Sequence, residues 1–271
     1  MKKISETLVI IRGGGDIATG SIQKLFRAGF KLLILDIEKP SAIRRRVAFC
    51  EAIYDGECTI EGIKSVFCKN KDEIEMAWKE RNIPIVIDPK GEYIKLFKPD
   101  IVVDAILAKK NMGTEITMAP GVVGLGPGFD AGKNCHIAIE TMRGHNLGRV
   151  IFSGPTIANT GTPGVIKGVG KERVIYSPAA GKIKNIAEIG DIVEKGQTIA
   201  TIGEVEVSAT ISGVLRGLIR DGYEVPEHFK IADIDPRIEE QQNCFTISDK
   251  ARAVGGAVLE AVLILLSKNS K

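Results

Sequence analysis

A short apolar run that leads into a glycine-rich turn constrains the fold of this chain more than any other feature. Leu8–Ile11 are strand formers, and the next residues, Gly13-Gly14-Gly15-Asp16-Ile17-Ala18, fit the pattern G-x-G-x-x-A. Apolar residues then recur with helical spacing, and Lys31–Asp36 has the composition of a strand buried on both faces. The sequence therefore predicts a Rossmann-type β-α-β unit within its first forty residues.

The glycine turn and the acidic end of the second strand predict a nucleotide site. A glycine-rich turn lets a pyrophosphate approach the backbone, and the helix N-terminus that follows attracts phosphate. An acidic residue about twenty positions further on accepts hydrogen bonds from a ribose, and it favours NAD over NADP because it repels a 2′-phosphate. The predicted binding residues are Gly13, Gly14, Gly15, Asp16, Ile17 and Asp36. A decayed site, or one for another nucleotide, is the alternative.

Length and composition bound the remaining possibilities. The 271 residues favour two domains, and 44% hydrophobic with 26% charged residues is an ordinary globular mixture. A net charge of +3, dispersed apart from Arg44-Arg45-Arg46, argues against a nucleic-acid partner. The three arginines could reach a phosphate, or they could lie on a solvated helix face.

No export signal or membrane span is expected. The apolar run near the N-terminus is too short for a signal sequence, and Ala253–Leu266 contains an acidic residue and two glycines. Five widely spaced cysteines without a C-x-x-C pair indicate neither a disulfide framework nor a zinc site. We expect a cytoplasmic protein without a bound metal, and the sequence leaves a homo-oligomer open.

Strand and helix patterns alternate through the first part of the chain, as in an α/β sheet. Strands are expected at Pro84–Ile87, Ile101–Val103, His136–Ile139 and Val150–Phe152, with a helix over Asp72–Arg81. Between about Lys110 and residue 164, many glycines and prolines predict mainly turns and loops. We assign residues 1–168 to a Rossmann-type domain with a glycine-rich C-terminal part.

A repeat of 32 residues organises the next region. It places Gly181 on Gly213, Gly190 on Gly222, Val193 on Val225, Ile199 on Ile231, Ala200 on Ala232 and Ile202 on Ile234. Glycines that bound short β-rich runs at a repeated spacing predict two similar half-units related by a pseudo-twofold axis. We assign residues 169–240 to this duplicated β domain and residues 241–271 to a C-terminal helix, capped at Ser248-Asp249, that packs on the first domain.

Polar residues in the glycine-rich part form the best second site. Glu140 and Arg143 could pair, His145 could act as acid or base, and Cys135 beside His136 could be an activated thiolate. Neighbouring residues of a strand point to opposite faces, which weakens the cysteine and histidine pairing. Hydrogen bonds that stabilise the loop are the alternative for each, so the catalytic candidates Glu140, Arg143, His145 and Cys135 have no assigned reaction.

The duplicated β domain resembles a biotinyl/lipoyl-like barrel-sandwich hybrid over about sixty residues. Carrier domains of that kind present a lysine on the hairpin between the two halves. Here no lysine occurs from Gln197 to Leu215, and Glu204-Val205-Glu206-Val207 occupies the expected tip. The sequence therefore predicts a scaffold or docking module without a carrier function.

Over nearly its whole length the sequence resembles the YqeB family. The motifs that carry the resemblance are Arg12-Gly13-Gly14-Gly15-Asp16-Ile17-Ala18-Thr19-Gly20, Ala119-Pro120-Gly121-Val122-Val123-Gly124-Leu125-Gly126-Pro127-Gly128, Glu140-Thr141-Met142-Arg143-Gly144-His145-Asn146-Leu147-Gly148 and Ser248-Asp249-Lys250-Ala251-Arg252. The resemblance implies an association with selenium-dependent molybdenum hydroxylases. It also implies a Rossmann part like that of XdhC-type proteins, which help to insert sulfur at the molybdenum of related enzymes.

Two functions follow as expectations. The first is an accessory protein that binds NAD, NADP or a molybdopterin-type dinucleotide and assists cofactor modification or insertion for a molybdenum hydroxylase polypeptide or its maturation machinery. The second is an NAD-dependent oxidoreductase that acts on a small molecule and uses His145 or Glu140 for proton transfer. Whether the protein catalyses a reaction, and whether it handles sulfur or selenium, is left open at this stage.

Overall fold

The computed structural model describes residues 3–159, 161 and 167–268, and the chain divides into two units. The first, called here the α/β unit, comprises Met1–Pro40, Ala48–Asn159 and Ile247–Lys271. The second, the β unit, comprises Ser41–Val47 and Thr160–Thr246. The chain thus contributes a short piece to the β unit directly after the second strand of the α/β unit.

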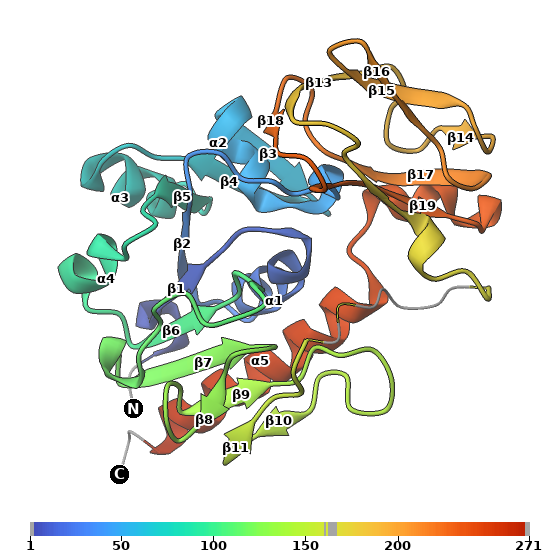
Figure 1. Ribbon diagram of the computed structural model, residues 1–271. Coiled ribbons are helices and arrows are strands. Elements are labelled where there is room, and N and C mark those ends of the chain that lie inside the picture. Colours follow the sequence, from blue (N-terminus) through green and yellow to red (C-terminus); the bar gives the residue numbers. More distant parts are fainter. Residues whose placement is uncertain (1–2, 160, 162–166, 269–271) are drawn as a thin grey trace. The chain divides into compact units, whose positions relative to one another are not determined.

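Among the described residues, nine strands form the main sheet of the α/β unit, in the order β10-β9-β7-β6-β1-β2-β5-β4-β3 (Figure 1). The inner strands from β9 to β4 are all parallel, and the edge strands β10 and β3 are antiparallel to their neighbours. The strands are β1 (Leu8–Arg12), β2 (Lys31–Asp36), β3 (Glu57–Ile60), β4 (Ile63–Phe67), β5 (Ile83–Ile87), β6 (Ile101–Asp104), β7 (Gly121–Leu125), β9 (Ile137–Ile139) and β10 (Val150–Ile151). A separate pair joins β8 (Asp130–Ala131) to β11 (Gly154–Pro155).

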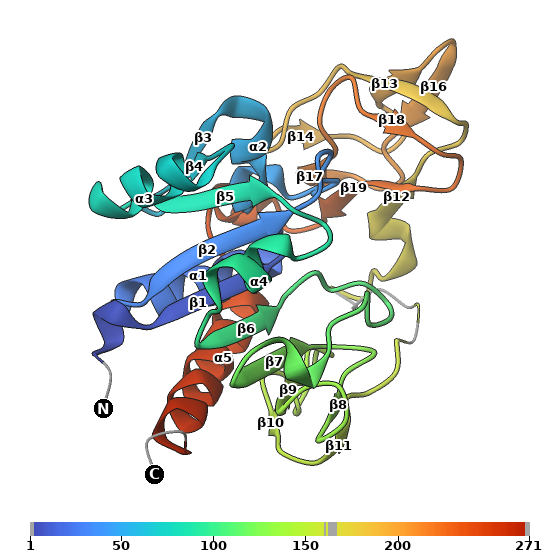
Figure 2. The same ribbon diagram turned by 90° about the vertical axis from the view of Figure 1, so that its left-hand side faces the viewer.

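Helices cover both faces of this sheet (Figure 2). On one face α1 (Asp16–Arg27) packs closely on α5 (Asp249–Lys268), because Gly20 and Gly255 lie against backbone atoms of the partner helix and leave no room for a Cβ. On the other face α3 (Lys71–Lys79) and α4 (Glu92–Phe97) bury Ile74 and Ile94 in the core. The remaining helical turns are α2 (Ala52–Asp55) and the 3-10 segments Ile4–Glu6, Arg45–Val47, Phe49–Glu51, Ile116–Met118, Lys171–Arg173 and Ile238–Phe245.

The structure confirms the strand, turn and helix order of the first forty residues and the strands expected near residues 84, 101, 136 and 150. Turns and loops make up most of the glycine-rich part, as expected, but the segment also contains a strand that was not predicted. Gly121–Leu125 form β7, a buried strand between β6 and β9. Its glycines serve close packing, because the ring of Phe129 fills the space beside Gly124 and the side chain of Leu265 lies beside Gly121.

In the described part of the β unit, two antiparallel sheets of four strands form, in the orders β12-β19-β17-β14 and β16-β15-β13-β18. Both contribute to one apolar core, which includes Ile183, Val193, Leu215 and Ile234. The strands are β12 (Val174–Tyr176), β13 (Gly181–Asn185), β14 (Ile192–Val193), β15 (Thr198–Ile202), β16 (Val205–Ser208), β17 (Gly213–Leu218), β18 (Glu224–Val225) and β19 (Lys230–Asp235).

The strands confirm the predicted repeat. Each of β13, β14 and β15 begins 32 residues before β17, β18 and β19, respectively. The halves also exchange partners symmetrically, because β13 pairs with β15 of its own half and β18 of the other, while β17 pairs with β19 and β14. The hairpin that joins the halves, β15 to β16, turns at Gly203 and Glu204, so its tip has no lysine.

The C-terminal helix begins where the sequence predicts a cap. The Ser248 hydroxyl accepts a hydrogen bond from the backbone N–H of Ala251 at 3.2 Å. The helix ends at Lys268, and residues 269–271 of the expected segment lie outside the described residues. Within the described part of the chain, no helix is both long and apolar enough to cross a bilayer.

Candidate functional site

The glycine turn lies at the carboxyl end of β1, beside the start of the loop that follows β6. Gly13 has φ +93°, and a Cβ there would come within 2.8 Å of the Ile106 Cα, so both the turn and the close approach require glycine. Its N–H donates to the Leu35 carbonyl at 2.8 Å, which ties the turn to β2. In open α/β sheets, ligands bind outside the carboxyl ends of the strands where the chain order reverses. The pair β1 and β6 forms that position here.

Asp36, the last residue of β2, faces the glycine turn. One carboxylate oxygen accepts the Gly14 N–H at 2.7 Å, and the other accepts the Ile37 N–H at 2.8 Å. Burial raises the pKa of Asp36, although these two hydrogen bonds act in the opposite direction. The glycine turn and Asp36, the predicted ribose acceptor, are thus joined by a direct hydrogen bond. In this structure the Gly14 N–H donates to the Asp36 carboxylate.

The first turn of α1 keeps donors available for an anion. The N–H groups of Gly15, Ile17 and Ala18 make no hydrogen bond within the described chain, as is usual at a helix N-terminus. Around Gly15 no heavy atom lies within 4 Å of the position that a Cβ would take. The helix end therefore presents backbone donors and open space at the same residue, which suits a phosphate group.

One side of the turn is covered by the segment that re-enters the α/β unit after Val47. The Cys50 N–H donates to the Gly14 carbonyl at 3.0 Å, and the Phe49 N–H lies 3.4 Å from the Thr19 hydroxyl oxygen. Burial raises the pKa of the Cys50 thiol well above its usual value. Cys50 therefore packs against the turn as a neutral side chain.

A buried polar network connects the ends of β1 and β6. Arg12 is 5% exposed and Asp104 is 2% exposed, and their nearest charged atoms lie 3.4 Å apart. The Thr114 hydroxyl donates to Asp104 at 2.5 Å and accepts a hydrogen bond from Arg12. Burial raises the pKa of Asp104, whereas the Thr114 hydrogen bond and the Arg12 charge lower it. This network was not predicted from the sequence, although Asp104 directly follows one predicted strand and Asp36 ends another.

The same network fixes the loop from Ala105 to Thr114 beside the glycine turn. The Ile106 N–H donates to Asp104 at 3.1 Å, and the Asn111 side chain makes two hydrogen bonds with the backbone of Thr114. Two exposed lysines, Lys109 and Lys110, extend this loop into solvent. They are cations on an anchored loop that borders the glycine turn.

The catalytic candidates do not form an acid and base pair. Glu140 is 2% exposed, and its carboxylate accepts the N–H groups of Thr141, Met142 and Ile157 at 2.7, 2.7 and 2.8 Å. Arg143 instead binds Asp249 at 3.0 and 3.2 Å on the surface. The suggested pairing of Glu140 with Arg143 is therefore wrong, because backbone donors already surround the carboxylate.

His145 and Cys135 also lie apart. His145 is exposed in the loop after β9, whereas Cys135 is 0% exposed within the sheet core. Burial raises the pKa of Cys135 to about 11, so the structure does not support an activated thiolate there. The neighbouring His136 accepts the Val122 N–H on Nδ1 at 3.0 Å, and burial lowers its pKa.

The three consecutive arginines contact the β unit, to which they belong. Arg44 is buried and donates to the carbonyls of Asn243 and Thr246, and Arg45 donates to the Leu218 carbonyl at 3.1 Å. Arg46 lies 3.2 Å from Glu188. The buried Arg44 does not lie on a solvated helix face, and contacts within the β unit account for the run without a phosphate. Among the described residues, no group of three or more His, Cys, Asp or Glu side chains could hold a metal ion.

The parallel sheet and the glycine turn define the class of protein: a mixed α/β protein with a large Rossmann-like parallel sheet and additional antiparallel sheets. No protein-family profile matches the chain. The chain is 49% identical over 264 residues to "Uncharacterized protein YqeB" of Escherichia coli (strain K12). The match covers 97% of the chain and 49% of that protein, so the chain spans about half the length of its relative. This similarity supports the resemblance to the YqeB family over the matched residues, which are nearly all of this chain and about half of the relative.

Similar solved structures include TcdA (CsdL), with a TM-score of 0.36 and 11% identity over 98% of this chain and 89% of that one. The E. coli tRNA N6-threonylcarbamoyladenosine dehydratase TcdA in complex with AMP gives a TM-score of 0.35 and 10% identity over 99% and 89% of the two chains. A succinylglutamate desuccinylase/aspartoacylase from Rhodobacter sphaeroides gives 0.27 and 16%, over 84% and 85%. All three scores lie below 0.5.

Proposed function

We propose that the protein is a cytoplasmic accessory factor in the maturation of selenium-dependent molybdenum hydroxylases, and that it binds a phosphate-bearing nucleotide at the glycine turn. The observation that carries the proposal is the combination of open space and backbone donors at Gly15 with the Asp36 carboxylate on Gly14. A dinucleotide or a molybdopterin-type dinucleotide offers both a pyrophosphate and a ribose to such a site.

The residues present fit this group of ligands. The N–H groups of Gly15, Ile17 and Ala18 would hold a phosphate, Lys109 and Lys110 would balance its charge, and Asp36 would accept a ribose hydroxyl. Of the simple dinucleotides the carboxylate favours NAD over NADP, since a 2′-phosphate would lie against a second negative charge. When bound, the cofactor supplies the reactive chemistry, and the chain binds and orients it.

An accessory role agrees better with the remaining candidates than an NAD-dependent oxidoreductase does. Glu140 is held by three backbone donors and Cys135 is a buried neutral thiol, so neither is available for proton transfer at the crevice. His145 lies exposed on a separate loop. We also infer that the duplicated β unit is a barrel-sandwich hybrid that serves as a docking module for the hydroxylase or its maturation machinery.

The test is a gene deletion in an organism that makes a selenium-dependent molybdenum hydroxylase. The proposal predicts a hydroxylase polypeptide that is present but inactive, with molybdopterin synthesis intact and the terminal sulfur or selenium ligand missing. The wild-type gene and a Cys135→Ser variant should restore activity, whereas Gly15→Val should not. Normal hydroxylase activity and normal chalcogen content in the deletion strain would refute the proposal. NADH turnover by the purified protein alone would favour the oxidoreductase function.

A further inference from the structure

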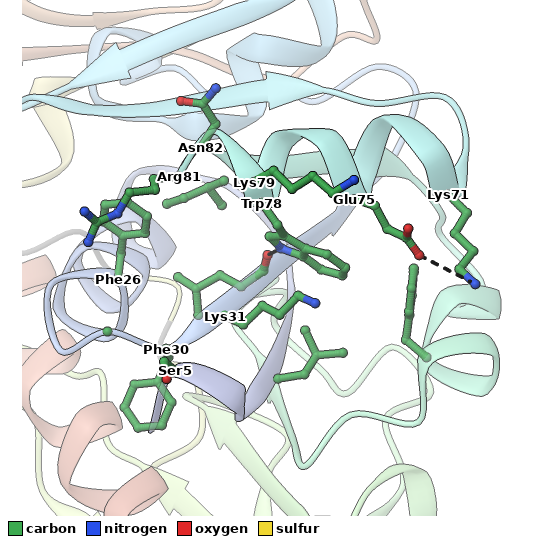
Figure 3. Close-up of a pocket in the computed structure, with 15 residues that line it drawn as sticks. Ser5, Phe26, Phe30, Lys31, Lys71, Glu75, Trp78, Lys79, Arg81 and Asn82 are labelled. Atoms are coloured by element: carbon green, nitrogen blue, oxygen red, sulfur yellow. Dashed lines mark hydrogen bonds and ion pairs between the residues drawn. The ribbon is translucent and has the colours of Figure 1, made fainter. Parts of the chain in front are cut away.

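A second surface feature lies at the N-terminal ends of the parallel strands of the α/β sheet (Figure 3). A groove of about 1000 Å³ is bounded there by the first residues of β1, β2 and β5, by the C-terminal end of α1 and by one side of α3 along its length. The glycine turn lies at the other end of the same strands, so the groove is separate from the proposed nucleotide site.

The lining of the groove is strongly cationic. Four cationic residues line it, Lys31, Lys71, Lys79 and Arg81, and the acidic residue of the lining is Glu75, which lies 3.7 Å from Lys71. The groove therefore carries a net charge of +3, as large as the net charge of the whole chain. The remaining residues of the chain sum to no net charge, so the excess positive charge of the groove favours an anionic partner there.

The spacing of the cations favours an extended partner over a single small anion. Lys71 and Lys79 mark the two ends of α3, about 12 Å apart along the axis at roughly 1.5 Å per residue. Arg81 follows two residues after Lys79. A single phosphate could not reach all three, whereas four residues of extended peptide span about 13 Å.

The aromatic residues argue against nucleic acid as that partner. Lys31 lies 3.7 Å from the centroid of the Trp78 ring, and the indole N–H donates to the Leu32 carbonyl at 2.6 Å. Phe97 packs edge-on against Trp78 at 5.4 Å and stacks on Tyr93 at 5.9 Å. Lys31 covers one face of Trp78, and Tyr93 and Phe97 stack on each other, so part of the aromatic surface that bases would need is taken up within the protein. Phe26, half-buried on the groove wall, offers an apolar contact for a side chain.

We propose that this groove binds an extended acidic segment of a partner protein. Carboxylates of the segment pair with Lys71, Lys79 and Arg81, and an apolar side chain between them packs beside Phe26. The inference is independent of the nucleotide site, because the two involve opposite ends of the sheet.

The chain contains its own probe, because Trp78 is its only tryptophan and lines the groove. The ligand to use is a fluorescein-labelled hexapeptide of four glutamates, one leucine and one phenylalanine. Its anisotropy reports binding to the full chain, and a change in Trp78 emission with unlabelled peptide locates the bound peptide. We expect saturable binding that weakens with added salt, as charge-driven association does.

The decisive variant is Lys71→Gln with Lys79→Gln, since both side chains are exposed and outside the sheet core. It should weaken peptide binding by about tenfold, the scale of two lost exposed ion pairs. The matched control, Lys184→Gln with Lys230→Gln, removes the same charge from exposed positions of the β unit and should bind as the wild type does.

Three results would overturn the proposal. They are equal affinity in the two double variants, no binding up to 1 mM peptide, and tighter binding of a single-stranded oligothymidylate that displaces the peptide. The last result would assign the groove to nucleic acid.

Discussion

Replacing Asp104 by asparagine should destabilise the α/β unit by about 3 kcal/mol. The substitution removes the charge that faces Arg12, which is 5% exposed, and leaves a buried guanidinium without its carboxylate. Breaking a buried pair on one side costs roughly 3–5 kcal/mol. The lower end applies here, because the 3.4 Å separation is long and because burial already raises the pKa of Asp104, so losing that charge also relieves a desolvation cost.

Urea unfolding followed by Trp78 fluorescence measures this change within the α/β unit. With a slope of about 1–3 kcal/mol per molar urea, the midpoint should fall by roughly 1–3 M. Glu57→Gln is the matched control, because it breaks an exposed pair with Lys64 and should cost less than about 1 kcal/mol. If Asp104→Asn unfolded within 0.5 kcal/mol of the wild type, the argument for a stabilising pair at the ends of β1 and β6 would fail.

Three further predictions test other parts of the account. Gly20→Ala should lower the free energy of unfolding by about 2–3 kcal/mol, because the new Cβ would meet the Ala251 carbonyl. Gly256→Ala in the partner helix has open space around its Cβ, so it should leave stability unchanged or raise it slightly in the same urea assay. Burial raises the pKa of Cys135 to about 11, so roughly one in a thousand protein molecules carries a thiolate there at pH 8. Peptide mass spectrometry of native protein should therefore find almost no iodoacetamide adduct at Cys135, and rapid alkylation would contradict its burial. Intact-mass analysis after expression in a biotin- and lipoate-competent cell should give the unmodified chain, and a stoichiometric adduct within residues 175–234 would refute the absence of a carrier lysine.

Local patterns were enough to predict the first β-α-β unit. The strand, the glycine turn and the helix lie within forty residues, and Asp36 is placed beside the turn simply because adjacent parallel strands end at one edge. The 32-residue repeat could also be predicted from the sequence, since a duplicated unit repeats both its glycines and its strand positions.

Contacts between residues far apart in the sequence could not be predicted from local patterns. The strand β7 was hidden because two of its five residues are glycines, and their role depends on Phe129 and Leu265, which no local pattern connects with them. Arg143 lies three residues from Glu140 but pairs with Asp249, more than a hundred positions away. Such choices of partner follow from tertiary packing, which sequence spacing does not encode.

The burial of single side chains was also beyond the sequence. Cys135 was a candidate thiolate because histidine follows it, yet its side chain lies in the core, where burial suppresses ionisation. Arg12 and Asp104 were overlooked for the opposite reason, because charged residues at strand ends are usually solvated.

Calorimetric titration of the wild type and of Gly15→Val with NAD, NADP, ATP and CTP tests the central claim most directly. Gly15 has φ −67° and open space around its Cβ position, so the chain accepts valine without strain and the new side chain fills only the space proposed for a phosphate. The account predicts that at least one of these nucleotides, NAD before NADP, binds the wild type below millimolar concentration, and that Gly15→Val abolishes the binding while unfolding at the same urea concentration. No binding below 1 mM by any of the four, or undiminished binding by a folded Gly15→Val, would contradict it.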